Sequence, residues 1–75
     1  MRIELSKTYR YSPIFFDRFF PIVIKGKPIE PDTNVVVTKV NVDPLKLFVW
    51  IKDKKGNVQS VYQKSLLPFM PKPII

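Results

Sequence analysis

Residues 45–53, LKLFVWIKD, carry the clearest structural signal in the chain. The odd-numbered positions from 45 to 51 are all aliphatic: Leu45, Leu47, Val49 and Ile51. The even-numbered positions are basic or aromatic: Lys46, Phe48, Trp50 and Lys52. A period of two is typical of a β-strand, in which successive side chains point to opposite faces. The stretch therefore predicts a strand with an aliphatic, core-facing side and an aromatic–lysine side.

The segments on both sides of this strand also predict β-structure. Residues 35–42 (VVVTKVNV) are rich in β-branched side chains and predict a strand whose even-numbered residues share one face, followed by a turn at 43–44. After the central strand, the glycine-containing stretch DKKGN at 53–57 predicts a hairpin connection to a return strand over 58–63. Residues 65–67 predict either a turn of 3₁₀ helix or a short last strand.

The N-terminal third contains the aromatic segment KTYRYSPIFFDRFF at residues 7–20. The pair Ser12-Pro13 predicts the N-cap and first position of a short helix over 13–20. In that helix Asp17 and Arg18 would lie opposite a broad apolar stripe, which consists of Phe15, Phe16, Phe19 and Phe20. The alternative is an irregular loop with the same aromatic residues tucked under the sheet.

Two more strands complete the predicted fold. Residues 2–6 alternate polar and apolar side chains, and residues 21–25 (PIVIK) form a short apolar run before a proline-stiffened loop at 26–34. Closing five short strands into a barrel would remove sticky strand edges. We therefore expect a mainly β protein, a small five-stranded barrel or half-open roll over residues 1–69, with a Pro-rich extended tail at 70–75.

Composition excludes most catalytic chemistry. The 75-residue chain has no cysteine and no histidine, so it lacks thiolate ligands and nucleophiles as well as the usual general base. Its six carboxylates are scattered, and its two glycines are thirty positions apart, so no phosphate-cradling loop is present. We expect a non-catalytic protein with no cofactor, no metal site and no small-molecule substrate. The formal net charge of +7 points instead to an acidic partner.

The stretch from Asn34 to Phe69 resembles small SH3-like β-barrels. The likeness rests on the lengths and order of five segments: VVVTKVN, KLFVWIKD, DKKGN, VQSVYQ and SLLPF. The N-terminal aromatic segment is longer than such a barrel would have between its first two strands. SH3-like barrels serve as nucleic-acid binders, protein-interaction modules and subunits of assemblies, so the resemblance leaves these functions open.

The aromatic–lysine face is the first candidate site. Aromatic rings in a strand offer stacking platforms for bases, and neighbouring lysines can contact phosphates of single-stranded RNA or DNA. The candidate residues come from the central strand, the hairpin tip and the return strand: Lys46, Phe48, Trp50, Lys52, Lys54, Lys55, Tyr62 and Lys64. The structural alternative is that Phe48 and Trp50 pack with Phe16 and Phe19 in a second small core.

The second candidate site would bind a protein. Tyrosine, arginine and phenylalanine near the N-terminus suit a docking surface, and the apolar C-terminal residues suit a partner groove. The residues concerned are Tyr9, Arg10, Tyr11, Phe15, Phe16, Arg18, Phe19, Phe69, Met70, Ile74 and Ile75. The alternative function is therefore an adaptor or assembly subunit that docks on a larger acidic protein complex. The structural alternative is that Tyr9 and Tyr11 are buried and anchor the loop instead of binding a partner.

We expect no signal peptide, and no apolar run of the sequence is long enough to cross a bilayer. We expect a cytoplasmic protein by default, and the lack of a long amphipathic helix disfavours a membrane partner. The sequence leaves homo-oligomerisation open.

Overall fold

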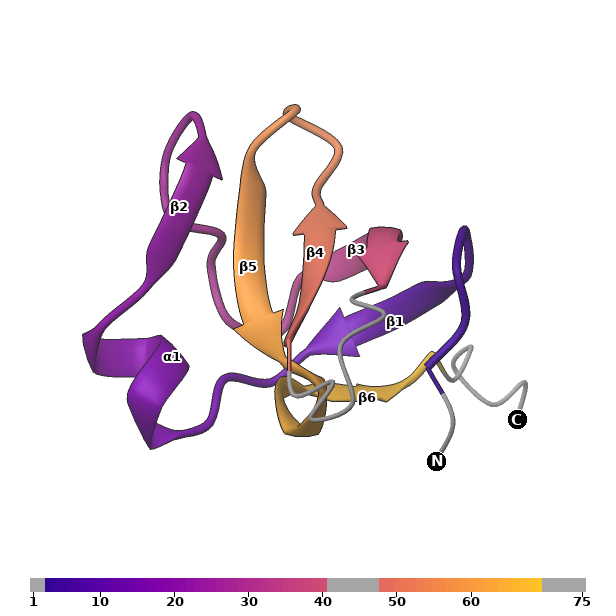
Figure 1. The fold of residues 1–75 in the computed structure, drawn as a ribbon, viewed down its shortest axis with the longest axis horizontal. Coiled ribbons are helices and arrows are strands. Elements are labelled where there is room, and N and C mark those ends of the chain that lie inside the picture. Colours follow the sequence, from indigo (N-terminus) through magenta and orange to yellow (C-terminus); the bar gives the residue numbers. More distant parts are fainter. Residues whose placement is uncertain (1–2, 41–47, 70–75) are drawn as a thin grey trace, which may run out of the picture.

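The structure, a computed structural model, describes residues 3–40 and 48–69 (Figure 1). The elements in chain order are β1 (Thr8–Tyr11), α1 (Phe15–Phe19), β2 (Ile22–Lys25), β3 (Asn34–Val40), β4 (Phe48–Lys52), β5 (Val58–Tyr62), the 3₁₀ turn η1 (Gln63–Ser65) and β6 (Leu66–Pro68). The protein is thus mainly β, as predicted. It has six strands in its described part instead of the expected five.

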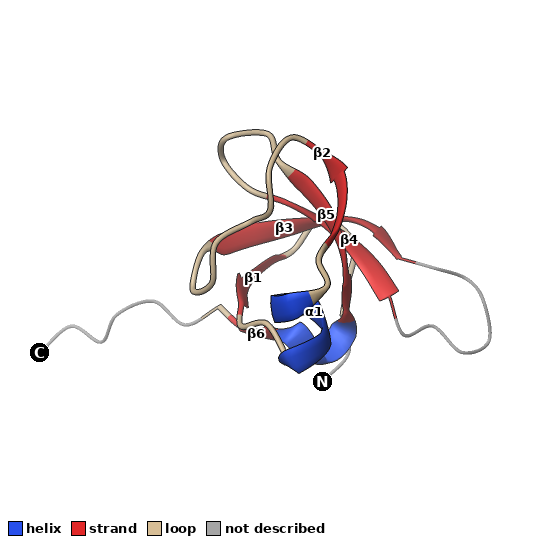
Figure 2. Ribbon diagram, turned by 90° about the vertical axis from the view of Figure 1, so that its left-hand side faces the viewer, coloured by secondary structure: helices blue, strands red, loops and turns tan. Residues whose placement is uncertain are grey.

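The strands form one antiparallel sheet in the order β2-β5-β4-β3-β1-β6. The sheet curls, so β1 and β6 cross below the β3–β4–β5 meander (Figure 2). β6 pairs with β1 at one edge, and β2 lies beside β5 at the other. The short helix α1 connects β1 to β2 at the lower end of the sheet in both views (Figures 1 and 2).

The core lies inside the curl and follows the predicted alternation. Val49 and Ile51 are fully buried, while Phe48 and Trp50 on the other side of β4 are half-buried and Lys52 is exposed. Tyr11 and Gln59 make the core partly polar: the Gln59 Nε2 donates to the Tyr11 hydroxyl over 2.9 Å. The Gln59 Oε1 accepts from the backbone N–H of Ile29, also over 2.9 Å. Every polar atom in this chain of contacts is therefore paired, which buried polar groups require.

The predicted alternation of residues 35–42 fails halfway along β3. Val35 and Val37 are buried and Val36 and Thr38 are exposed, but the register against β4 shifts between Val37 and Lys39. This bulge inserts one extra residue, so the side chains beyond it change faces. Val40 therefore packs against the core, while residues 41–47 lie outside the described part.

The prediction of a first strand at residues 2–6 is wrong. Within the described residues 3–6, the chain makes a turn at Leu5 and Ser6, where Ser6 has a φ of 66°. The strand instead begins at Thr8, and its inward residues Tyr9 and Tyr11 are buried. The Tyr9 hydroxyl accepts a hydrogen bond from the Glu4 N–H over 2.8 Å, so the tyrosine also organises the preceding turn.

The expected helix over 13–20 is shorter and is capped differently. It spans Phe15–Phe19, its N-cap is Ile14, and no side chain caps it. Ser12 does not form the predicted N-cap. The N–H of the N-cap residue Ile14 instead donates to the Oγ of Ser65, a residue distant in the sequence, over 3.1 Å. Ser12 is held by its backbone, whose N–H donates to the Ser65 carbonyl over 2.7 Å.

Asn57 ties the β4–β5 hairpin to the loop after β2. Its Oδ1 accepts from the Lys27 N–H over 3.0 Å, and its Nδ2 donates to Asp53 Oδ2 over 2.9 Å. Gly26 and Gly56, one in each loop, both have positive φ, 79° and 88°. A Cβ at Gly26 would overlap the Asn57 amide, whereas a Cβ at Gly56 would meet open space.

These two glycines give a matched test of the tie. Gly56→Ala should lower the free energy of unfolding by about 1–2 kcal/mol, the cost of a left-handed backbone for an L-residue. Gly26→Ala should cost more, because it carries the same backbone strain and also displaces the Asn57 side chain. Urea unfolding of both variants checks this. Equal losses would show that Asn57 is free to move away.

Candidate functional site

The registers of β3, β4 and β5 bring the aromatic–lysine face together. Residues directly opposite each other in an antiparallel pair lie on the same side of the sheet. Trp50 is opposite Lys39 of β3 and Ser60 of β5, and Phe48 is opposite Tyr62. The outer face of the meander therefore carries three aromatic rings with lysine beside them.

The rings on this outer face contact one another and a cation. Phe48 and Tyr62 have ring centroids 4.3 Å apart, and the Lys39 Nζ lies 4.8 Å from the centre of the Trp50 ring. The second distance is typical of a cation–π contact. All three rings are half-buried, so each keeps part of its surface accessible. A lysine placed against an indole ring combines a stacking surface with a positive charge at one point.

Helix α1 extends the aromatic row of this face. Phe16 meets the Tyr62 ring edge-on at 5.3 Å between centroids, and Phe20 follows Phe16 at 5.7 Å. The second small core predicted from Phe48, Trp50, Phe16 and Phe19 differs from this row, in which Tyr62 lies between Phe16 and Phe48. Phe16 packs against the Tyr62 end of the row, whereas Phe19 pairs with Phe15 at 4.8 Å.

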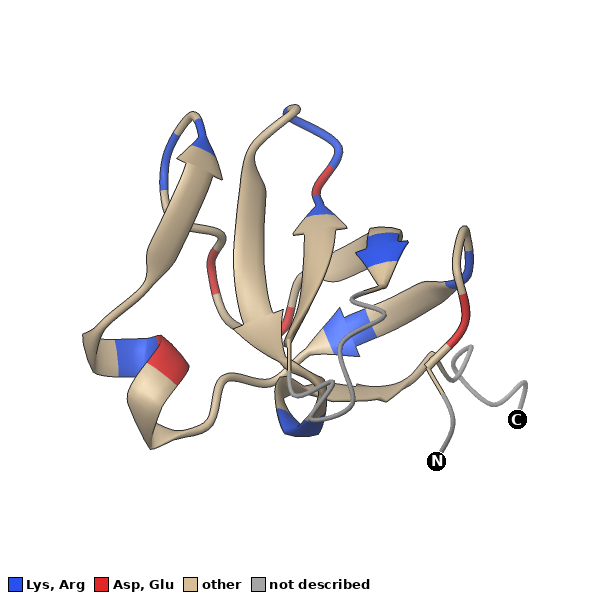
Figure 3. Ribbon diagram, viewed as in Figure 1, with Lys and Arg blue, Asp and Glu red and all other residues tan. Residues whose placement is uncertain are grey.

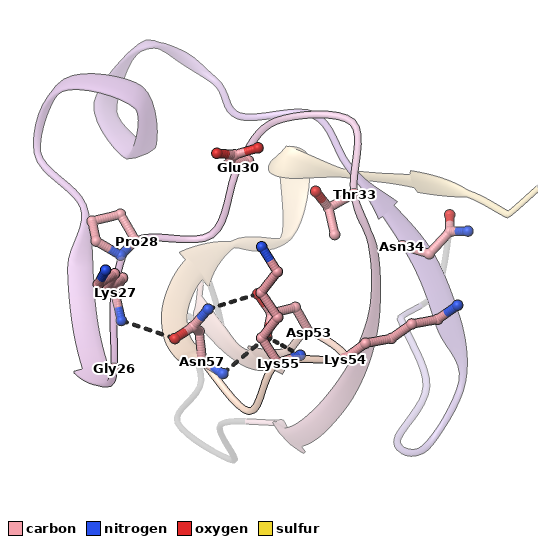
Figure 4. A pocket seen from close by; sticks show the side chains of 10 residues that line it. All are labelled: Gly26, Lys27, Pro28, Glu30, Thr33, Asn34, Asp53, Lys54, Lys55 and Asn57. Atoms are coloured by element: carbon pink, nitrogen blue, oxygen red, sulfur yellow. Dashed lines mark hydrogen bonds between the residues drawn. The ribbon is translucent and has the colours of Figure 1, made fainter.

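Lysines gather at the other end of the sheet. Figure 3 shows basic segments at the tip of β2 and of the β4–β5 hairpin. The exposed residues here are Lys25, Lys27, Lys52, Lys54 and Lys55. Three of them line an open pocket of about 670 Å³ between the two loops, together with Glu30, Asp53 and Asn57 (Figure 4). The Asn57 tie fixes the spacing of the two loops and therefore of their cations.

The inner side of α1 holds a buried carboxylate. Asp17 is 1% exposed, and its Oδ2 accepts from the Ser65 hydroxyl and, over 3.0 Å, from the Tyr62 N–H. Its Oδ1 has no hydrogen-bond partner among the described residues. Burial raises the pKa of Asp17, although the hydrogen bonds from Ser65 and Tyr62 act in the opposite direction.

Asp17 lies on the buried side of α1. The sequence placed Asp17 opposite the apolar stripe and left open whether the phenylalanines pack under the sheet or form a docking surface; in the structure the carboxylate is buried and the phenylalanines are exposed. Phe15 is 73% exposed, and Phe19 and Phe20 are each 60% exposed. The adjoining strand β2 is exposed at all four positions, including Ile22, Val23 and Ile24. Large apolar side chains therefore cover one side of the molecule.

The remaining predicted site residues are distributed as follows. Arg10, Arg18, Lys64 and Phe69 are exposed. Tyr9 and Tyr11 do not lie on a surface; they are core residues, because β1 turns its odd-numbered side chains inward. The rest of the predicted residues lie outside the described part of the chain: Lys46, Met70, Ile74 and Ile75.

Two features were not anticipated from the sequence. Lys39 reaches Trp50 only because of the bulge in β3, which has no local sequence signal. The exposure of β2 was also missed, since a short apolar run such as IVI is typical of a buried strand. Its flanking residues, Pro21 and Lys25, were the available hint of an edge strand.

Comparison with known proteins gave no match: no family model fits the sequence, and neither a curated protein nor a solved structure is significantly similar. Among residues 3–40 and 48–69, no helix has the length and apolarity to cross a membrane. Within the same ranges, no three acidic side chains come together as a metal-ion site. The site must therefore be interpreted from its own geometry.

The raised pKa of Asp17 predicts a specific pH dependence of stability. The folded protein favours the protonated carboxyl, so this stabilisation is fully present below the ordinary Asp pKa and is lost as pH rises through the raised folded value. In Asp17→Asn the side chain stays neutral and this component disappears. Urea unfolding across acidic pH should show the wild type losing stability relative to Asp17→Asn as pH rises. Parallel profiles for the two proteins would contradict the assignment.

Proposed function

We propose that this protein binds single-stranded nucleic acid on the outer face of β3, β4 and β5. The observation that carries the proposal is the register of the meander, in which Trp50 lies beside Lys39 and Phe48 lies beside Tyr62. Stacking platforms next to cations are the arrangement with which proteins hold single strands independently of sequence. The proposed activity is binding alone, without catalysis or a cofactor.

Each part of the face has a chemical role in this proposal. Bases would stack on the accessible surfaces of Trp50 and of the Phe48–Tyr62 pair, at about 1–3 kcal/mol for each stacked base. Lys39 and Lys52 would contact the phosphates beside those bases. The bound nucleic-acid strand would then continue toward Lys54 and Lys55, the exposed lysines of the hairpin tip. Lys46 and Lys64, which the sequence predicted as nucleic-acid-binding residues, remain part of this proposal as further phosphate contacts.

We also propose that the curled sheet is an SH3-like barrel. The support is the order of its elements: a meander of three strands, then the 3₁₀ turn η1, then a short last strand that pairs with the first. In this interpretation, α1 and β2 are a long excursion between the first two barrel strands. A cytoplasmic location fits a nucleic-acid binder and belongs to the same proposal.

A second candidate function is docking on an acidic protein complex, as an adaptor or assembly subunit. It is favoured by the outward-facing phenylalanines of α1, because large exposed apolar patches mark interaction surfaces. The patch and the aromatic–lysine face share only the end of the aromatic row at Phe16 and Tyr62. The two functions are therefore separable by mutation.

Titration with a short single-stranded oligonucleotide tests the first proposal. Trp50 is the chain's single tryptophan, so its fluorescence reports directly on the proposed face. We expect quenching at low salt and weaker binding at high salt, because bound phosphates displace counterions. Lys39→Gln and Lys52→Gln should each reduce the slope of log affinity against log salt by about 0.7.

Lys7→Gln is the matched control, since Lys7 is an exposed lysine in the turn before β1, paired with Glu4 at 2.5 Å. It should leave the salt slope unchanged. A wild-type protein whose fluorescence does not respond at low salt would exclude the nucleic-acid function.

A further inference from the structure

One side of the molecule is an apolar edge made by α1 and β2. Its members are consecutive or nearly so in the chain and all are exposed: Phe15, Phe16, Phe19, Phe20, Ile22, Val23 and Ile24. In Figures 1 and 2 both elements lie on the same side of the sheet, with β2 as its outermost strand. Soluble monomers rarely expose so many adjoining large apolar residues, which indicates that something covers them.

The backbone of β2 narrows what that occupant can be. Among the described residues only β5 pairs with β2, so the other side of the strand presents its N–H and C=O groups without a neighbouring strand. Natural edge strands are usually blunted by inward charges or prolines. β2 has some of these devices, with Pro21 before it, Lys25 at its end and a register shift against β5 between Val23 and Lys25, but three consecutive positions are exposed branched aliphatic residues. An extended partner segment would satisfy this edge in two ways. Its backbone would pair with the open N–H and C=O groups of β2, and its apolar side chains would cover the exposed aliphatic residues.

A lipid surface and a second copy of the chain fit this edge less well. Lipid tails cannot pair with the open backbone groups of a strand, which makes burial of β2 in a bilayer costly. A second copy would bring another +7 charge to the contact. Three exposed cations, Arg18, Lys25 and Lys27, flank the edge and would face their counterparts or lie close to them. Complementary charge therefore favours an acidic partner.

We propose that an extended acidic segment of a partner protein adds to β2 as an additional strand. Its apolar side chains would pack on the phenylalanines of α1, and its carboxylates would meet Arg18, Lys25 and Lys27. This is β-augmentation, in which main-chain hydrogen bonds supply affinity and alternate side chains supply specificity. The inference rests on the second candidate function, docking on an acidic protein, and specifies how that docking occurs.

The test uses the full chain, labelled with ¹⁵N, and a short capped peptide in which Val and Glu alternate. Addition of this peptide should shift the amide signals of β2 and α1 and leave those of β6, the opposite edge, in place. A second peptide with Lys in place of Glu should bind at least about tenfold more weakly, because it meets the same cations. A third peptide, N-methylated at every backbone amide, keeps the side chains but has no N–H group left to donate to a strand edge.

Two matched variants locate the contact. Ile24→Glu places a charge in the middle of β2, where the wild-type side chain is 43% exposed, and should weaken binding of the Val–Glu peptide at least about tenfold. Leu67→Glu makes the same kind of change on β6, where the side chain is 37% exposed. It should leave the peptide affinity unaltered, and folding of both variants is checked in the same spectra.

Each other outcome has a definite meaning. Equal binding of the N-methylated peptide would overturn strand addition and leave docking on an acidic protein standing. If none of the three peptides shifted the amide signals of β2, both strand addition and docking on an acidic protein would be overturned. A dimer that strengthens with salt and is lost in Ile24→Glu would make a second copy the occupant instead. If the protein bound phosphatidylglycerol vesicles through β2 and α1 more tightly than it bound the peptide, the occupant of the apolar edge would be a lipid surface.

Discussion

The carboxylate of Asp17 holds α1 against the turn that follows β5, through the Tyr62 N–H and the Ser65 hydroxyl. Burying an acid is costly unless it is hydrogen-bonded, and these two donors make the arrangement sustainable. Because one side of a five-residue helix is used for this contact, the remaining side must carry the phenylalanines outward. The exposure of the α1 phenylalanines is therefore a geometric consequence of one buried polar anchor.

The outer face of the meander depends on a different constraint, the strand register. The aliphatic residues of β4 are buried, which directs Phe48, Trp50 and Lys52 outward whatever their own preference. The register with β5 then adds Tyr62, and the bulge in β3 adds Lys39. The protein thus has two surfaces of different physical character. The aromatic–lysine face is arranged by the pairing of β3, β4 and β5 and is rich in cations. The phenylalanine surface of α1 is arranged by the Asp17 side chain and is apolar.

The sequence predicted what depends on neighbouring residues and missed what depends on distant ones. The period-two pattern of residues 48–52 was sufficient to assign both faces of β4, because alternation is a local rule. The burial of Asp17 could not be predicted, since its hydrogen-bond partners lie 45 and 48 positions away in the chain. β1 was missed for a related reason: Tyr9 and Tyr11 are core residues only because distant polar groups and strands surround them.

Tyr62 lies where the two surfaces meet. Its ring lies between Phe48 of the meander and Phe16 of the helix, and its N–H is one of the two groups that hold Asp17. A ligand on either surface that favours one position of this ring changes the free energy of binding at the other. Thermodynamic linkage makes such a coupling reciprocal, with the same factor in both directions. Tyr62 is therefore the residue through which any coupling between the two proposed binding surfaces would pass.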